Sequence, residues 1–451
     1  MLSTVAAQEK TPPLGFMLAW LADQIGGAPQ LIRAPAVIAG LAIVPMVGVL
    51  AKRCFGEVAG LAAAALAAAS PMLVFYSVEA RSYSLTAALC LASTLLLLRL
   101  IDTGSRTAAV GYALAAGAAL MSHYTAFGVL AAQAVVAFVA WPDRRREVAW
   151  AQAGPIMVTA DWLPGLIDQT RISADELARI AAVAPLSFDT TATIIGRNLL
   201  GHPLVDLDRV PGAVGTWLIV AGAALAAGFA VSRLTAWLRD PERRLPQRET
   251  VLLAAIAVAA PTVAIIVSSQ PHQSMMFPRN LMASLPAALV LVAALLTRPP
   301  RAAAITATGL VVGGFAIGTV IEVTQTQRPA AAKAAAAIAG RWQPGDRIVE
   351  LCCLTGGNGP LGTAVSTALG QREVRALSVL SKTGDAPFEE SLADRRRLFV
   401  IGYVPAGQTK QLFFDPPPPW AGAFRPVWQK RWPGLLETVA TEYAYQPAAE
   451  G

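Results

Sequence analysis

Apolar residues in this chain are gathered in blocks rather than dispersed at helical spacing. Most blocks are about 17–20 residues long, the length that a helix needs to cross roughly 30 Å of hydrocarbon. Helices of soluble proteins instead show shorter apolar runs, with polar residues along one face. The pattern predicts an all-α polytopic membrane protein with about ten transmembrane helices. The predicted spans are residues 33–51, 58–76, 83–100, 107–121, 124–140, 148–165, 213–231, 251–269, 280–297 and 302–321.

Both ends of the chain depart from this pattern. The segment Thr11–Ile25 is too short to span and contains Asp23, which favours an interfacial or re-entrant helix. After residue 321 a helical run at Ala330–Arg341 is followed by strand-like stretches, one in PGDRIVELCC and one at 397–404. The predicted organisation is therefore an outer-face interfacial segment (1–31), a transmembrane core (32–321) and a small extracytoplasmic α/β domain (322–451).

Charged residues fix the predicted orientation. Apolar residues make up 55% of the chain and charged residues 14%, with a net charge of +7. The basic residues lie in alternate short loops, as in membrane proteins that use arginine to set their topology, which argues against nucleic acid as a partner. The basic loops are predicted to be cytoplasmic. The long loop 166–212, which contains a helix-like piece at 174–182, and the C-terminal domain are predicted to face outward.

The stretch SPMLVFYSVEARSYSL places Glu79, Arg81 and Tyr83 where a span emerges on the outer face. Ionisable residues at membrane depth are costly and mark function by default, and arginine binds phosphate through its bidentate fork. The alternative is structural, because Glu79 and Arg81 could pair with each other as an interfacial clasp.

Further polar groups are predicted at the same membrane level. They are His123, Tyr124, Asp161, Asp168 and Arg279. Taken singly, His123 is typical of a hydrogen-bonded packing residue, and Arg279 could be a snorkelling anchor. A set of anchors would not need carboxylates, so the convergence of acids and bases favours a site.

The sequence resembles the GT-C glycosyltransferases. The segments that carry the resemblance are TPPLGFMLAWL, LIRAPAVIAGLA, AKRCFG, ASPMLVFYSVEARSYSL, SHYTAF, WLPGLIDQ and FPRNLMASLPA. Within that superfamily it is similar to bacterial relatives of dolichyl-phosphate-mannose–protein mannosyltransferases, which include the lipid A aminoarabinose transferases. The match runs from about residue 9 to 297, and YSxEARSYSL is its most specific part.

The resemblance implies inverting transfer of a sugar from a polyprenyl phosphate to a glycan, lipid or protein acceptor outside the cytoplasmic (inner) membrane. Arg81 and Tyr83 then correspond to donor-phosphate contacts, with Glu79 orienting Arg81. Arg279 corresponds to the arginine of the family's late PRY element, with Asn280 in place of tyrosine. This substitution removes the ring contact but keeps the arginine.

The catalytic base is the part that the sequence does not locate. Family members carry a further span and an outer acidic loop before the TPPL segment, and that acid is usually taken as the base. Here Met1 lies almost directly before TPPL, so Glu9 and Asp161 are the candidate bases. Whether Met1 is the true start, and whether the chain as given catalyses transfer, both stay open.

Two rival functions remain: a non-catalytic polyprenyl-phosphate-binding relative that supports a partner enzyme, and a transporter or flippase. Transporters place charges near the midplane between repeated halves, and the sequence shows no repeat. Adjacent Cys352 and Cys353 match no metal pattern. No cofactor is predicted, and metal dependence, the sugar, the acceptor and the oligomeric state stay open.

Overall fold

The structure is a computed structural model. It describes residues 11–26, 29–160, 162, 164, 185–239, 247–271, 273–325, 328–351, 360–370, 374–377, 397–405 and 424–446. Glu9, Asp161, Asp168 and the predicted helix at 174–182 lie outside these residues. Contacts divide the chain into two compact units, residues 1–177 with 184–321 and residues 178–183 with 322–451.

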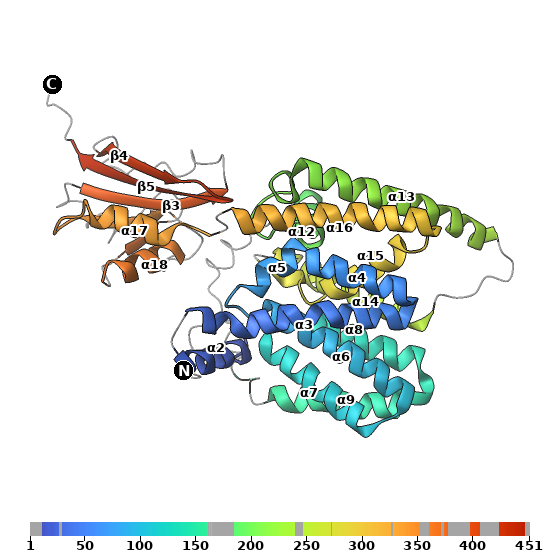
Figure 1. The fold of residues 1–451 in the computed structure, drawn as a ribbon. Helices are drawn as coiled ribbons and strands as arrows, with labels where there is room; N and C mark the ends of the chain where they lie inside the picture. Colours follow the sequence, from blue (N-terminus) through green and yellow to red (C-terminus); the bar gives the residue numbers. More distant parts are fainter. Residues whose placement is uncertain are drawn as a thin grey trace. The chain divides into compact units, whose positions relative to one another are not determined.

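The first unit is a bundle of helices (Figure 1). Its elements are α2 (Leu14–Gly26), α3 (Pro29–Phe55), α4 (Glu57–Ala69), α5 (Pro71–Ser77), α6 (Tyr83–Thr103), α7 (Arg106–Ser122), α8 (Ala126–Ala140), η1 (Pro142–Arg144), α9 (Arg145–Ala160), α12 (Phe188–Leu200), η2 (Asp208–Gly212), α13 (Ala213–Arg239), α14 (Arg248–Ser268), η3 (Pro278–Leu281), α15 (Leu285–Leu296) and α16 (Arg301–Thr324). Apolar side chains such as Ile43, Leu97 and Leu289 form its core. Other large apolar side chains, including Leu41 and Trp217, point outward, as expected of helices that face lipid.

Every predicted span contains a helix, but the helices differ in length. Among the described residues, five are long and apolar enough to cross a membrane: Gln30–Phe55, Tyr83–Thr103, Asp208–Ser232, Arg248–Ser268 and Arg301–Thr324. Two bent pairs, α4 with α5 and α8 with η1 and α9, would raise the number to seven. The chain is therefore an integral membrane protein, and the count of ten spans stays a prediction.

Polar contacts join neighbouring helices at one end of the bundle and in its interior. At one end Arg53 pairs with Asp102, and Arg144 Nε donates to the carbonyl oxygen of Ile101 at 3.0 Å, so three of the predicted basic loops lie side by side. Between the ends, the buried Gln133 amide donates to Thr94 Oγ1 (2.9 Å) and Ser93 Oγ (3.0 Å), joining α8 to α6. Such bonds satisfy polar groups that lipid could not.

A side chain at the start of α15 bonds to the backbone in the middle of α14. Ser284 Oγ accepts the Ala260 N–H at 3.0 Å and donates to the Ile256 carbonyl at 2.6 Å. These two backbone groups would pair with each other in a regular helix. The hydroxyl therefore bridges the ladder just before Pro261 and ties the start of α15 to the middle of α14.

The predicted loop 166–212 contains a helix that the sequence analysis missed. Ser187 Oγ accepts from Thr190 N (3.1 Å) and caps α12, which buries Ile194 and Asn198. The segment FDTTATII is rich in β-branched residues, which lower helix propensity. Its apolar residues lie on one face rather than in a continuous block, so a search for span-length blocks did not detect it.

The second unit contains a five-stranded mixed sheet. The strands are β1 (Arg347–Leu351), β2 (Val374–Leu377), β3 (Arg397–Pro405), β4 (Phe424–Trp432) and β5 (Leu436–Tyr445), in the order β2-β1-β3-β5-β4. The first three are parallel, and β5 is antiparallel to β3 and β4. The strands predicted in PGDRIVELCC and at 397–404 are thus present. The predicted helical run at 330–341 forms α17 (Ala331–Ala339).

A buried carboxylate joins the sheet to its second helix, α18 (Pro360–Ala368). Glu350, near the end of β1, is fully buried. Its oxygens accept from the backbone N–H groups of Leu361 (3.2 Å) and Gly362 (2.7 Å) in the first turn of α18. A negative charge there is favourable because the free N–H groups and the helix dipole make that end positive.

Candidate functional site

Several segments far apart in the sequence meet at the end of the first unit opposite the Arg53–Asp102 pair. The ring centroids of Tyr83 and His123 lie 5.3 Å apart, and those of Tyr76 and Tyr83 lie 4.9 Å apart. The ring of Phe75 also meets that of His202, at 4.8 Å. Aromatic contacts therefore join the α5–α6 turn, the α7–α8 turn and the segment after α12.

The local sequence explains the turn that carries Glu79 and Arg81. Ser70 caps α5, with Pro71 at the first helical position, and α5 ends at Ser77. A new helix then begins at Tyr83, where Thr86 Oγ1 donates back to the Ser82 carbonyl (2.8 Å). In the intervening turn the Glu79 side chain is half-buried and that of Arg81 is exposed.

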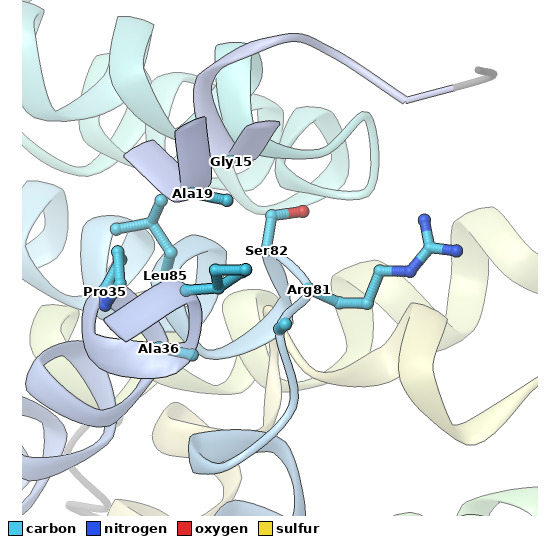
Figure 2. A pocket seen from close by; sticks show the side chains of 9 residues that line it. Gly15, Ala19, Pro35, Ala36, Arg81, Ser82 and Leu85 are labelled. Atoms are coloured by element: carbon cyan, nitrogen blue, oxygen red, sulfur yellow. The ribbon is translucent and has the colours of Figure 1, made fainter. Parts of the chain in front are cut away.

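Helix α2 forms the wall of a pocket beside Arg81. One small hollow of about 30 Å³ is lined by Phe16, Arg81, Tyr83 and His123, and a second, of about 20 Å³, continues from it between α2 and α3. A Cβ at Gly15 would lie only 2.9 Å from Ser82 Cβ, so glycine permits the close approach of α2. Figure 2 shows Arg81 extending away from the small residues of α2 and α3.

His123 is a neutral imidazole among positive charges. Its Nδ1 accepts from the backbone N–H of Thr125 (3.2 Å) and lies 2.9 Å from Thr125 Oγ1, so the ring proton is on Nε2. Burial, helped by the charges of Arg279 and Arg81, lowers the pKa of His123 to about 4. Because both arginines act on the same ring, the structure brings together three residues that were predicted at one membrane level.

Arg279 stands on a loop that is tied down on several sides. The Asn198 amide donates to the Pro278 carbonyl (3.0 Å), and the Asn280 amide donates to the Met275 carbonyl (2.9 Å). The Arg279 guanidinium is exposed and lies over the Phe277 ring at 4.7 Å. Asn280 thus closes the loop that presents the arginine.

Of the remaining predicted site residues, the structure describes Tyr124 but not the three candidate carboxylates. Tyr124 OH accepts from Trp162 Nε1 at 3.0 Å. The candidate carboxylates Glu9, Asp161 and Asp168 lie outside the described residues. Within the described part of the chain no three His, Cys, Asp or Glu residues gather as metal ligands would. Metal dependence stays open.

Two residues of this region were missed by the sequence analysis. His202 is fully buried, packs edge-on against Phe75, and its Nδ1 accepts from Leu204 N at 3.1 Å. Asn198 is buried and supports the Arg279 loop. Both lie in GRNLLGHP, within the predicted loop 166–212: Asn198 is in the last turn of α12 and His202 follows that helix. The only sequence signal that could have pointed to His202 was its rarity, because the chain contains only three histidines.

Comparison with known proteins identifies the class of the fold. The structure is similar to ArnT from Cupriavidus metallidurans in the apo state, with a TM-score of 0.52 and 13% identity over 96% of this chain and 87% of that one. A structure of the same protein bound to undecaprenyl phosphate aligns with a TM-score of 0.48 at 14% identity. The chain thus has a fold similar to that of ArnT.

A sequence match covers the N-terminal third of the chain. Residues 10–160 match the family model described as dolichyl-phosphate-mannose-protein mannosyltransferase. No curated protein sequence matches the chain significantly. The predicted resemblance to GT-C glycosyltransferases of this family is confirmed.

Proposed function

We propose that the chain is an inverting glycosyltransferase that moves a sugar from a polyprenyl-phosphate donor to an acceptor at the outer face of the inner membrane. The observation that carries the proposal is the small pocket lined by Arg81, Tyr83 and His123, with the charge of Arg279 acting on the same imidazole. The family match over residues 10–160 supports the reaction class. The acceptor is a glycan, lipid or protein of the cell envelope.

The charges suit the displacement that the proposal requires. The acceptor oxygen bonds to the anomeric carbon as the bond from that carbon to the phosphate oxygen breaks, and the electron pair leaves with the polyprenyl phosphate. The diester donor carries about one negative charge, and the released monoester carries up to two. Arg81 and Arg279 therefore bind the leaving phosphate more strongly than the donor, which accelerates transfer.

The acceptor must lose a proton as it attacks. A carboxylate within hydrogen-bond reach is the group that would receive it, and Glu9 and Asp161 are the proposed bases, with Asp168 a further candidate. Neutral His123 would donate from Nε2 to a phosphate oxygen without adding a third positive charge. In this scheme Tyr83 packs against the His123 ring, and Glu79 orients Arg81.

The experiment measures donor binding and the release of free polyprenyl phosphate in nanodiscs. We expect Arg81→Ala and Arg279→Ala each to slow release by about 10²-fold or more, the typical cost of losing an electrostatic contact to developing charge. Arg106→Ala is the matched control, because Arg106 is an exposed arginine at the first residue of α7, near the basic loops. It should release product at the wild-type rate.

Two outcomes would contradict the proposal. If Arg81→Ala and Glu79→Ala lower thermal stability non-additively while donor binding is unchanged, the pair is a structural clasp. If the wild-type chain binds donor but releases no polyprenyl phosphate with any acceptor class, it is a binding protein that supports a partner enzyme.

A further inference from the structure

A wide groove lies away from the site just described, along the first turns of α4 and α16. Val58 and Leu61 of α4 form one wall, and Ile305 and Thr308 of α16 form the other. The groove has a volume of about 790 Å³, within the roughly 300–1,000 Å³ of a typical ligand site. It is therefore large enough to hold part of a lipid molecule.

The walls of the groove are apolar and open sideways. Val58, Leu61 and Ile305 are 65%, 71% and 63% exposed, and all three belong to helices of the membrane-spanning bundle. Exposed apolar surface of this extent on such helices faces lipid chains. The groove is therefore accessible from the bilayer.

One end of the groove is positively charged. Arg301 lines it and begins α16, and exposed Arg298 lies just before. No acid among the described residues pairs with either arginine, whereas Lys52 nearby on α3 pairs with Glu57 at 3.3 Å. A Cβ at Gly60 of α4 would lie 2.8 Å from Lys52 Cβ, so α4 passes close to Lys52 here. Because Lys52 belongs to a predicted basic loop, this end of the groove lies at the end of the bundle that carries the basic loops.

A hydroxyl in the wall has no hydrogen-bond partner. Threonine in a helix commonly bonds the carbonyl four residues earlier, as Thr306 does to Ala302 at 3.0 Å. Thr308 Oγ1 is enclosed and makes no such bond among the described residues. It lies two helical turns, roughly 10 Å, beyond Arg301 along the axis of α16. A buried hydroxyl without a partner is costly, so the groove is suited to a ligand that carries an acceptor at that depth.

We propose that this groove binds an anionic membrane phospholipid from the leaflet on the side of the basic loops. Arg301 holds the phosphate, Thr308 donates to an ester carbonyl, and the acyl chains lie against Val58, Leu61 and Ile305. Basic pockets between transmembrane helices on the cytoplasmic side are suited to anionic headgroups. This site is independent of the sugar donor, which is proposed to bind at the opposite end of the bundle.

Native mass spectrometry of the delipidated, full-length protein tests the proposal with added phosphatidylglycerol and phosphatidylcholine. We expect phosphatidylglycerol to bind more tightly, and Arg301→Gln to weaken that binding at least about five-fold, the factor for one arginine near an anionic surface. The matched control is Arg106→Gln, which removes the arginine that begins α7 at the same end of the bundle. It should leave binding unchanged.

A second pair of variants tests the apolar walls. Leu61→Trp fills the groove and should reduce phosphatidylglycerol binding, whereas Val110→Trp on the exposed face of α7 should not. Equal losses in Arg301→Gln and Arg106→Gln would show a general surface potential and overturn the proposal. Equal binding of the two lipids, unaffected by Leu61→Trp, would show only a nonspecific lipid annulus and would overturn it as well.

Discussion

The neutral state of His123 matters because its neighbours are charged. Arg81 and Arg279 already bring two positive charges to this end of the bundle. A protonated imidazole would add a third positive charge to this end of the bundle. The Thr125 N–H fixes the tautomer with the proton on Nε2, so the ring contributes a hydrogen bond without a charge.

This arrangement predicts a defined pH dependence. His123 lies in the turn between α7 and α8, and its pKa is about 4 in the folded protein against 6.5 when unfolded. The unfolded chain therefore binds the proton first, and the stability present above pH 6.5 is lost as pH falls from about 6.5 to 4. We expect the thermal midpoint of the wild type to fall over this window more steeply than that of His123→Gln. Parallel pH profiles for the two proteins would show that His123 does not titrate in this way.

Sequence reasoning could propose the residues of the site but not their contacts. Arg81, Tyr83, His123 and Arg279 were predicted at one level because span ends are set by hydrophobic length. Which rings touch depends on how helices rotate against each other. Spans that are apolar all round carry little periodic signal for that rotation. For the same reason the supporting role of Asn198 was not predicted.

At the scale of elements, helix positions were predicted well and helix lengths were not. Apolar blocks located α3, α6, α13, α14 and α16. The predicted span 58–76 is divided at Ser70–Pro71 into α4 and α5, which meet at a bend of 58°. Proline removes a ladder hydrogen bond and clashes with the preceding turn, so the break was readable from the sequence. The start of the span at 280–297 is a 3₁₀ turn that presents Arg279.

The bridge between α14 and α15 predicts a stability effect. Ser284→Ala removes the hydroxyl that joins the Ile256 carbonyl to the Ala260 N–H, and both groups are buried. We expect a loss of about 1–3 kcal/mol in the free energy of unfolding, the cost of leaving buried polar groups unpaired. Thr306→Ala is the control, because Thr306 bonds only its own helix on an exposed face. Equal stability of the two variants, measured by thermal unfolding, would show that α14 closes its own ladder.

For the whole molecule, the positions of the charges predict which side faces outward. The basic loops are joined at one end by the Arg53–Asp102 pair, and the candidate site is at the other. Basic loops stay in the cytoplasm, so the site and the second unit should be outside.

Labelling of single cysteines in a background without native cysteines tests this orientation. Cysteines at the exposed positions Ala192, on α12, and Lys430, on β4, should react with an impermeant thiol reagent in intact cells. A cysteine at Arg106, at the basic end, should react only after lysis. The reverse pattern would overturn the topology and place the site on the cytoplasmic side.

The carboxylate of Glu350 bears on whether the second unit can bind nucleotides at the N-terminus of α18. In open sheets with parallel strands, phosphate groups of nucleotides bind at helix N-termini beyond the carboxyl ends of the strands. Here Glu350 already holds the backbone N–H groups of Leu361 and Gly362, so α18 is capped from within. We expect calorimetric titration of the intact protein with nucleoside diphosphates or nucleotide sugars to give no binding at this helix. Saturable heat that Glu350→Gln alters would contradict this expectation. The first turn of α18 would thus be indifferent to activated sugars that have not yet been transferred to lipid.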